Sequence, residues 1–133
     1  MNPTSSPFPR PFLDFVACFN RGEFWEGHEV LEGPWRGTRS DFYKGLILYA
    51  SAFVHVQRRN PRGVLAQLRK TERHLAPYRP GYLGLDLEAV LEHAARAAEM
   101  VGRTPVEWNS LLPPPLVPEP KLVRGDEPEL QSG

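Results

Sequence analysis

The feature that most constrains the fold is a segment of helical length, residues 46–56, that is apolar on nearly every side. Its apolar members are Leu46, Ile47, Leu48, Tyr49, Ala50, Ala52, Phe53, Val54 and Val56. A helix without a polar face is usually buried, so other elements must surround this one. The apolar run is too short to cross a bilayer, which needs about 20 residues. We therefore expect the central helix of a small helical domain.

The spacing of apolar residues predicts four more helices, each with one apolar stripe. With the central helix they cover about residues 11–19, a segment from 23 to the Gly33-Pro34 pair, 41–59, 61–75 and 87–101. Asn60 before a proline and Asp86 before a leucine predict helix N-caps, and Thr38 with Asp41 resembles a capping box. Pro34 should end or kink the second helix, because it lacks an N–H and crowds the preceding turn.

No segment shows the alternation of a strand, so the predicted fold class is all-α, a compact bundle or array of about five helices. Prolines are frequent at both ends of the chain. We divide the sequence into an extended arm over residues 1–10, a helical domain over 11–112, and a Pro-rich tail over 113–133 that is disordered or draped over the domain.

Composition narrows the choice of partner and compartment. Sixteen basic and 16 acidic residues cancel, which disfavours nucleic acid as a partner because most nucleic-acid binders are basic. The single cysteine, Cys18, gives no intramolecular disulfide, and the N-terminus lacks the pattern of a secretory signal. We expect a soluble cytoplasmic protein without a membrane partner. The excess of arginine over lysine is typical of some thermophiles, and also of GC-rich genomes.

The chemically suggestive stretch is residues 23–32, in which four carboxylates and a histidine occupy about three helical turns. Two of the carboxylates are explained by the helix start, where the dipole favours anions. The remaining candidates are His28, Glu29 and Glu32, with His55 of the central helix as their expected neighbour.

Three interpretations of this cluster and its surroundings stay open. We favour a buried polar network in a non-catalytic interaction or scaffold module, which could form a homodimer burying Trp25, Trp35 and Phe42. The second is a metal-dependent or acid–base enzyme, with His28, Glu32 and His55 as ligands of a divalent metal. The sequence does not contain the zinc-protease motif, because Glu32 stands where its second histidine would be.

The third interpretation is an anion or nucleic-acid binder. Arg62, Arg69 and Arg73 share one face of the fourth helix, and such a face could hold phosphate or another anion. The alternative for this face is internal pairing with acids of the last helix, which are Glu88, Glu92 and Glu99. Charge runs are more often paired or solvated than functional.

Three blocks of the sequence resemble a known family. They are residues 19–32, residues 45–55 and residues 59–63, which read FNRGEFWEGHEVLE, GLILYASAFVH and RNPRG. They are similar to the bacterial and plastid proteins grouped as domain of unknown function 309, over about residues 12–80. The resemblance implies a small all-helical domain and no established activity, cofactor or catalytic residue.

The resemblance also implies which residues are motif positions of that family. They are His28, Glu29, Glu32, Trp35, His55 and Asn60. The Gly33-Pro34 pair departs from the family pattern, in which the helix continues smoothly to the tryptophan.

Overall fold

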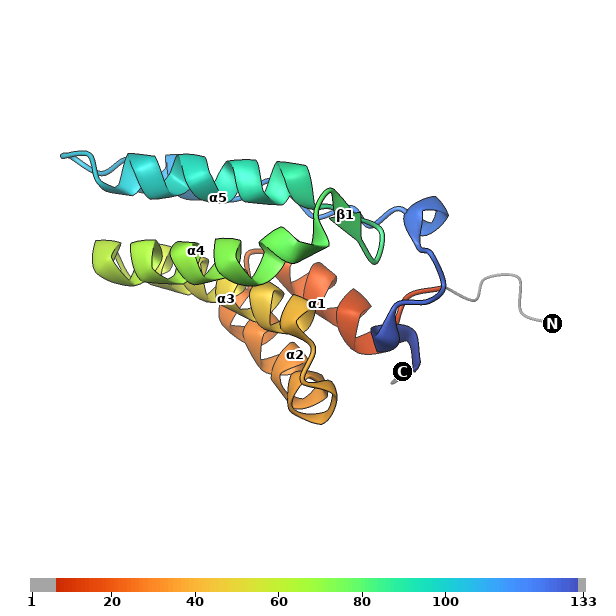
Figure 1. The fold of residues 1–133 in the computed structure, drawn as a ribbon. Coiled ribbons are helices and arrows are strands. Elements are labelled where there is room, and N and C mark those ends of the chain that lie inside the picture. The colour runs from red at the N-terminus through yellow and green to blue at the C-terminus, as the bar shows by residue number, and fades with distance from the viewer. Residues whose placement is uncertain (1–6, 132–133) are drawn as a thin grey trace.

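The computed structural model describes residues 7–131, so that part of the predicted N-terminal arm, residues 1–6, lies outside the described residues. Five α-helices pack together, which confirms the predicted fold class (Figure 1). They are α1 (Arg10–Asn20), α2 (Phe24–Thr38), α3 (Asp41–Gln57), α4 (Pro61–Leu75) and α5 (Leu87–Val101). None of the described helices combines the length and apolar character needed to cross a membrane.

Short elements complete the described chain. The strands β1 (Gly81–Tyr82) and β2 (Leu85–Asp86) form an antiparallel hairpin between α4 and α5, with Gly81 opposite Asp86 and Tyr82 opposite Leu85. The hairpin leaves no periodic signal in the sequence, because each strand has only two residues. Four 3₁₀ turns follow α4 or α5: η1 (Ala76–Tyr78), η2 (Trp108–Leu111), η3 (Pro120–Leu122) and η4 (Pro128–Gln131).

The helix starts follow the capping rules. The side chains of Asn60 and Asp86 accept hydrogen bonds from backbone N–H groups two or three residues into α4 and α5, as predicted. At α3 the cap is Ser40, whose hydroxyl accepts from the N–H of Tyr43. The capping box predicted at Thr38 is therefore wrong by two residues, because Thr38 still belongs to α2.

Of the two outcomes predicted at Pro34, an end or a kink, the helix end is wrong, since α2 continues to Thr38 with Pro34 inside it. A proline disfavours the helical conformation of the residue before it mainly by crowding that residue's N–H and Cβ, and Gly33 has no Cβ. The helix ends at Arg39, which adopts the left-handed conformation at φ 56° and donates its N–H to the carbonyl of Trp35.

The core surrounds α3, as expected. This helix packs against α2 on one side and α4 on the other, while α1 packs on α2 and α5 lies alongside α4 (Figure 1). Most residues of α3 are buried. The ring of Tyr49 stacks on Phe19 of α1 at 5.3 Å between centroids, and Phe53 lies edge-on to Tyr49 at 4.9 Å.

Two glycines allow α3 and α4 to approach closely. A Cβ added to Gly45 of α3 would lie 2.6 Å from Cγ of Leu75, and one added to Gly63 of α4 would lie 2.5 Å from Cγ of His55. Both distances are shorter than any normal carbon–carbon contact. The spacing of the α3–α4 hairpin therefore depends on the absence of these two side chains.

After α5 the chain returns along the helical domain. Asn20 of α1 holds Leu116 by two hydrogen bonds of 2.7 Å, one to its carbonyl and one from its N–H. Further along, the buried carboxylate of Glu129 accepts hydrogen bonds from the hydroxyls of Ser40 and Tyr82. Residues 113–131 are thus anchored to α1, to the start of α3 and to the hairpin.

Candidate functional site

The first candidate residues lie together on α2. Nε2 of His28 is 3.2 Å from a carboxylate oxygen of Glu32, one turn further along, and the other oxygen of Glu32 accepts a 2.6 Å hydrogen bond from Arg36. Nδ1 of His28 is 3.6 Å from Glu29. The imidazole also stacks on the ring of Trp25 at 5.2 Å between centroids. His28, Glu29 and Glu32 therefore form a local polar group within a single helix.

His55 has different partners. Nδ1 of its ring is 3.1 Å from the side-chain nitrogen of Asn60, whose oxygen accepts from the N–H of Gly63. The amide nitrogen must then be the donor, so Nδ1 of His55 is an acceptor and the proton of the neutral ring sits on Nε2. Burial, helped by the positive charge of Arg58, lowers the pKa of His55. This histidine is part of the N-cap of α4.

The structure does not bring these residues together as a metal site. Among residues 7–131 no group of three or more His, Cys, Asp or Glu side chains is placed to hold a metal ion. The predicted ligands His28, Glu32 and His55 form no such group in the described part of the chain, and they have other partners. Glu32 is engaged by a guanidinium and an imidazole of its own helix, and the acceptor nitrogen of His55 is engaged by an amide.

A third histidine, His93 of α5, escaped the sequence analysis. Its Nδ1 is hydrogen-bonded to the hydroxyl of Tyr49 at 2.8 Å, and its ring packs on Phe53 at 5.6 Å. Burial lowers the pKa of His93 and raises that of Tyr49. His93 lies beside the apolar stripe of α5, which contains Val90 and Ala97. That position in the sequence could have indicated a histidine close to the core. His93 joins α3 to α5.

The aromatic residues proposed for a dimer interface divide between core and surface. Phe42 is fully buried and contacts Phe12 and Tyr82, so it cannot contribute to such an interface. Trp35 is half-buried, whereas Trp25 is 49% exposed.

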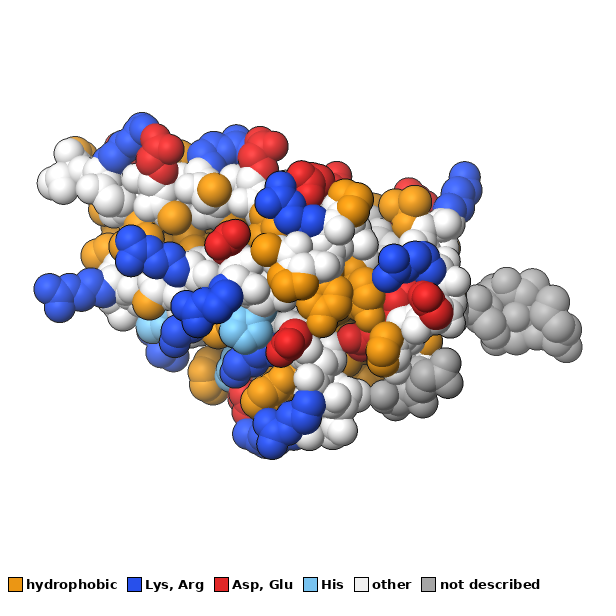
Figure 2. All heavy atoms as spheres, in the orientation of Figure 1, with side chains coloured by type: hydrophobic (Ala, Val, Ile, Leu, Met, Phe, Trp, Pro, Cys, Tyr) orange, Lys and Arg blue, Asp and Glu red, His pale blue; other side chains and the backbone are white. Residues whose placement is uncertain are grey.

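The clearest surface feature is a segregation of charge. Between residues 39 and 73 the chain has eight basic residues and two acidic ones, a net charge of +6, although the whole chain is neutral. We call the eight basic side chains the basic surface. They are Arg39, Lys44, Arg58, Arg59, Arg62, Arg69, Lys70 and Arg73. Figure 2 shows basic side chains gathered along α4 and below it.

No member of the basic surface forms an ion pair with any described carboxylate. Every arginine outside it does form one. Those arginines are Arg10, Arg21, Arg36, Arg79, Arg96, Arg103 and Arg124. Among the described arginines, the lack of an acid partner is therefore confined to this surface, which belongs to the α3–α4 hairpin and the residue that ends α2; outside it, Lys121 is the one described basic side chain without an ion pair.

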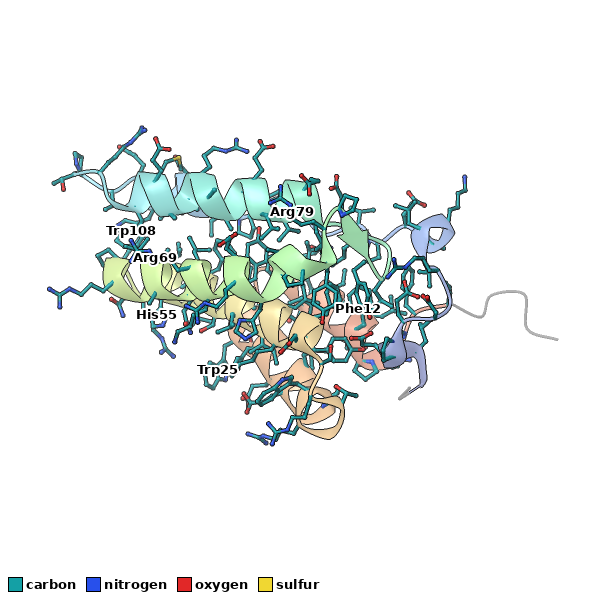
Figure 3. All side chains as sticks on the ribbon, in the orientation of Figure 1. Phe12, Trp25, His55, Arg69, Arg79 and Trp108 are labelled. Carbon is teal, nitrogen blue, oxygen red and sulfur yellow. The ribbon has the colours of Figure 1, made fainter. Side chains whose placement is uncertain are left out.

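Four members of the basic surface lie over tryptophan rings. Lys44 is 4.4 Å and Arg39 is 5.1 Å from the ring centre of Trp35. Similarly, Arg58 lies over Trp25 and Arg59 over Trp108, at 5.9 and 5.5 Å. Cation–π contacts of this kind hold a charge in place without neutralising it. Trp108 lies near one end of α4, and Arg79 near the other (Figure 3).

The other four members lie on α4 and form neither an ion pair with a described carboxylate nor a cation–π contact with a described ring. The internal pairing considered for Arg62, Arg69 and Arg73 is wrong, because the acids of α5 use closer partners. These acids form the pairs Glu88–Arg79, Glu92–Arg96 and Glu99–Arg103 at 2.7–2.8 Å. Glu92 and Arg96 are one turn apart on α5, and Glu99 meets Arg103 just beyond the end of that helix, so neither pair crosses to α4.

The fold and this surface define a small helical domain with a basic helical hairpin and no metal site among its described residues. Residues 12–66 match a family described as domain of unknown function (DUF309), which confirms the resemblance. The matched segment extends from α1 into the first turns of α4 and includes His28, His55 and Asn60. No curated protein and no solved structure matches the chain.

Proposed function

We propose that this chain is a non-catalytic interaction module that binds an acidic segment of a protein partner through the basic surface. The observation that carries the proposal is that all eight basic side chains between residues 39 and 73 lack a carboxylate, while every arginine elsewhere has one. An arginine left without an acid keeps its five N–H donors for an outside acceptor.

Local charge matters more than the neutral total for such an interaction. Charges on a protein surface are screened over about 8–10 Å at ordinary ionic strength, so a partner that approaches the α3–α4 hairpin responds to its net charge of +6. Complementary patches of this size mainly raise association rates and give specificity. The tryptophan contacts of Lys44 and Arg58 support the proposal, because they restrain long side chains that would otherwise lose entropy on binding.

The test measures binding of fluorescein-labelled poly-glutamate by fluorescence anisotropy at low and at physiological salt. We expect the wild-type chain to bind, with affinity that falls as salt increases. The triple variant Arg62→Gln, Arg69→Gln, Arg73→Gln should bind at least tenfold more weakly, because three exposed contacts each contribute up to about 1 kcal/mol.

The matched control is the triple variant Arg10→Gln, Arg96→Gln, Arg103→Gln. It removes the same charge from exposed arginines that already have an acid partner four residues away along the chain. We expect its affinity to stay within about twofold of the wild type. Equal losses in the two triple variants, or binding that is independent of salt, would contradict the proposal.

A further inference from the structure

A groove runs between α4 and α5 beside the basic surface. It encloses about 320 Å³ and is lined by Leu68, Arg69, Glu72, Ala94, Ala95 and Ala98. Figure 2 shows hydrophobic side chains in the depression between these two helices, with charged side chains on both sides. Leu68 and Ala94 are buried, whereas Ala95 is exposed. The groove therefore has an apolar floor that a ligand can reach.

The two rims of the groove differ in free charge. On the α4 side, Arg69 and Glu72 line the groove, and Arg62 and Arg73 share the face of Arg69 without an acid partner, so this rim keeps a net positive charge. On the α5 side, Glu92 is already paired with Arg96 of the same helix, and Glu99 with Arg103 just beyond its end. A ligand that complements this groove must bring negative charge to the α4 rim and needs none on the α5 rim.

The walls also restrict the shape of the ligand. An extended segment leaves half of its backbone N–H and C=O groups directed sideways, and two α-helices have no free backbone groups with which to pair them. A helix satisfies its own backbone, and the alanines of α5 let another helix approach within the usual 8–10 Å between axes. The helices of this chain already direct their apolar stripes into its own core, so a helix of another protein is the better occupant.

We propose that the groove between α4 and α5 binds an amphipathic helix of a protein partner. The apolar stripe of that helix lies over Ala95 and Ala98, and the acids bordering the stripe face Arg62, Arg69 and Arg73. This inference rests on the proposed function and specifies it, because it names the shape of the acidic segment and the place where it binds. It adds an apolar contact that poly-glutamate cannot make.

The experiment uses two synthetic 18-residue peptides of identical composition. In the first, leucines at helical spacing form one stripe bordered by glutamates; in the second, the same residues are shuffled so that no stripe exists. Anisotropy titrations with the full chain should give at least tenfold tighter binding of the first peptide. If the shuffled peptide binds equally well, the groove inference is refuted, while the proposed function stands.

Variants locate the binding site. Ala95→Trp fills the groove from an exposed position, and Ala17→Trp makes the same change at an exposed alanine of α1. We expect Ala95→Trp to weaken peptide binding at least tenfold and leave poly-glutamate binding within about twofold, whereas Ala17→Trp changes neither. Ala95→Gln replaces the tryptophan variant if thermal unfolding shows that the latter is not folded.

Three results would overturn the assignment. Unchanged peptide binding by folded Ala95→Trp places the helix elsewhere and rejects the groove. Self-association of the wild-type chain in sedimentation, abolished by Ala95→Trp, assigns the groove to a second copy instead of a partner. If the wild-type chain binds neither the peptide nor poly-glutamate, the proposed function is rejected together with the groove. If it binds poly-glutamate but does not prefer the striped peptide, only the groove is rejected.

Discussion

Replacing Gly45 by alanine tests whether the α3–α4 hairpin is held at the distance that the structure shows. The new methyl group would lie 2.6 Å from Cγ of Leu75 and 3.4 Å from Cβ of His74. Leu75 is fully buried at 0% exposure, so its side chain cannot turn into solvent to relieve the contact. Either α4 moves away from α3, or the leucine adopts an unfavourable rotamer.

The expected magnitude is the balance of two opposing effects. Within a helix, alanine is more favourable than glycine by about 1 kcal/mol, so propensity alone predicts that the variant is more stable. Forcing an extra carbon into a packed core costs about 1–3 kcal/mol, and a contact this short with an immobile neighbour belongs in the upper half of that range. We expect a net loss of about 1–2 kcal/mol, or a fall in melting temperature of about 3–10 °C.

Urea unfolding followed by circular dichroism measures the effect, with Gly37→Ala of α2 as the matched control. A Cβ at Gly37 meets nothing within 4 Å, so this variant should be as stable as the wild type or gain up to about 1 kcal/mol. The midpoint of Gly45→Ala should fall with an unchanged slope, the sign of a change in stability alone. The reasoning is refuted if both glycine variants are stabilised equally.

Three further changes test other contacts. Asn60→Asp keeps the N-cap but places a carboxylate beside Nδ1 of His55. The pKa of that histidine, measured by NMR titration, should therefore rise; an unchanged or lower pKa would contradict the contact between residues 55 and 60. Glu129→Ala leaves two hydroxyls without their acceptor and should weaken the anchoring of residues 113–131 by about 1–3 kcal/mol. Backbone amides in that segment should then exchange hydrogen faster than in the wild type, and equal protection in the two proteins would contradict this anchoring role. Burial lowers the pKa of His93 in the folded chain, so as the pH falls the unfolded chain takes up a proton before the folded chain does. The free energy of unfolding should therefore fall below about pH 6.5, by about 1.4 kcal/mol per unit of pKa difference between the two states. His93→Gln should lose that part of the pH dependence, and an identical pH profile in both proteins would rule it out.

The helices were predictable where one local rule dominates. The apolar segment of α3 indicated a central helix, because a helix with apolar side chains on nearly every side would expose some of them to water in any orientation at the surface. Asn60 before a proline indicated the start of α4. The error at Pro34 came from applying the proline rule alone, without weighing that the preceding residue, Gly33, has no Cβ to be crowded. The β1–β2 hairpin could not be predicted, because two-residue strands leave no periodic signal.

The site was less predictable, since it depends on which charges meet. Helical spacing correctly placed His28 one turn from Glu32, but it could not show that His55 turns to Asn60 instead. The same limit applies to α4 and α5: the sequence contains bases on one helix and acids on the other. Only the structure shows that Glu92 is paired within α5 and Glu99 with Arg103 just beyond it.

The extent of the family match separates two roles along the hairpin. The matched segment ends at residue 66 and contains Gly45, His55 and Asn60, which set the start of α4 and its distance from α3. The arginine that lines the groove, Arg69, lies beyond it, as does all of α5. The matched segment therefore carries five of the eight members of the basic surface, together with the residues that hold its backbone in place. The lining of the groove, by contrast, lies outside the matched segment, so the helical shape proposed for the partner follows from residues that the family match does not cover.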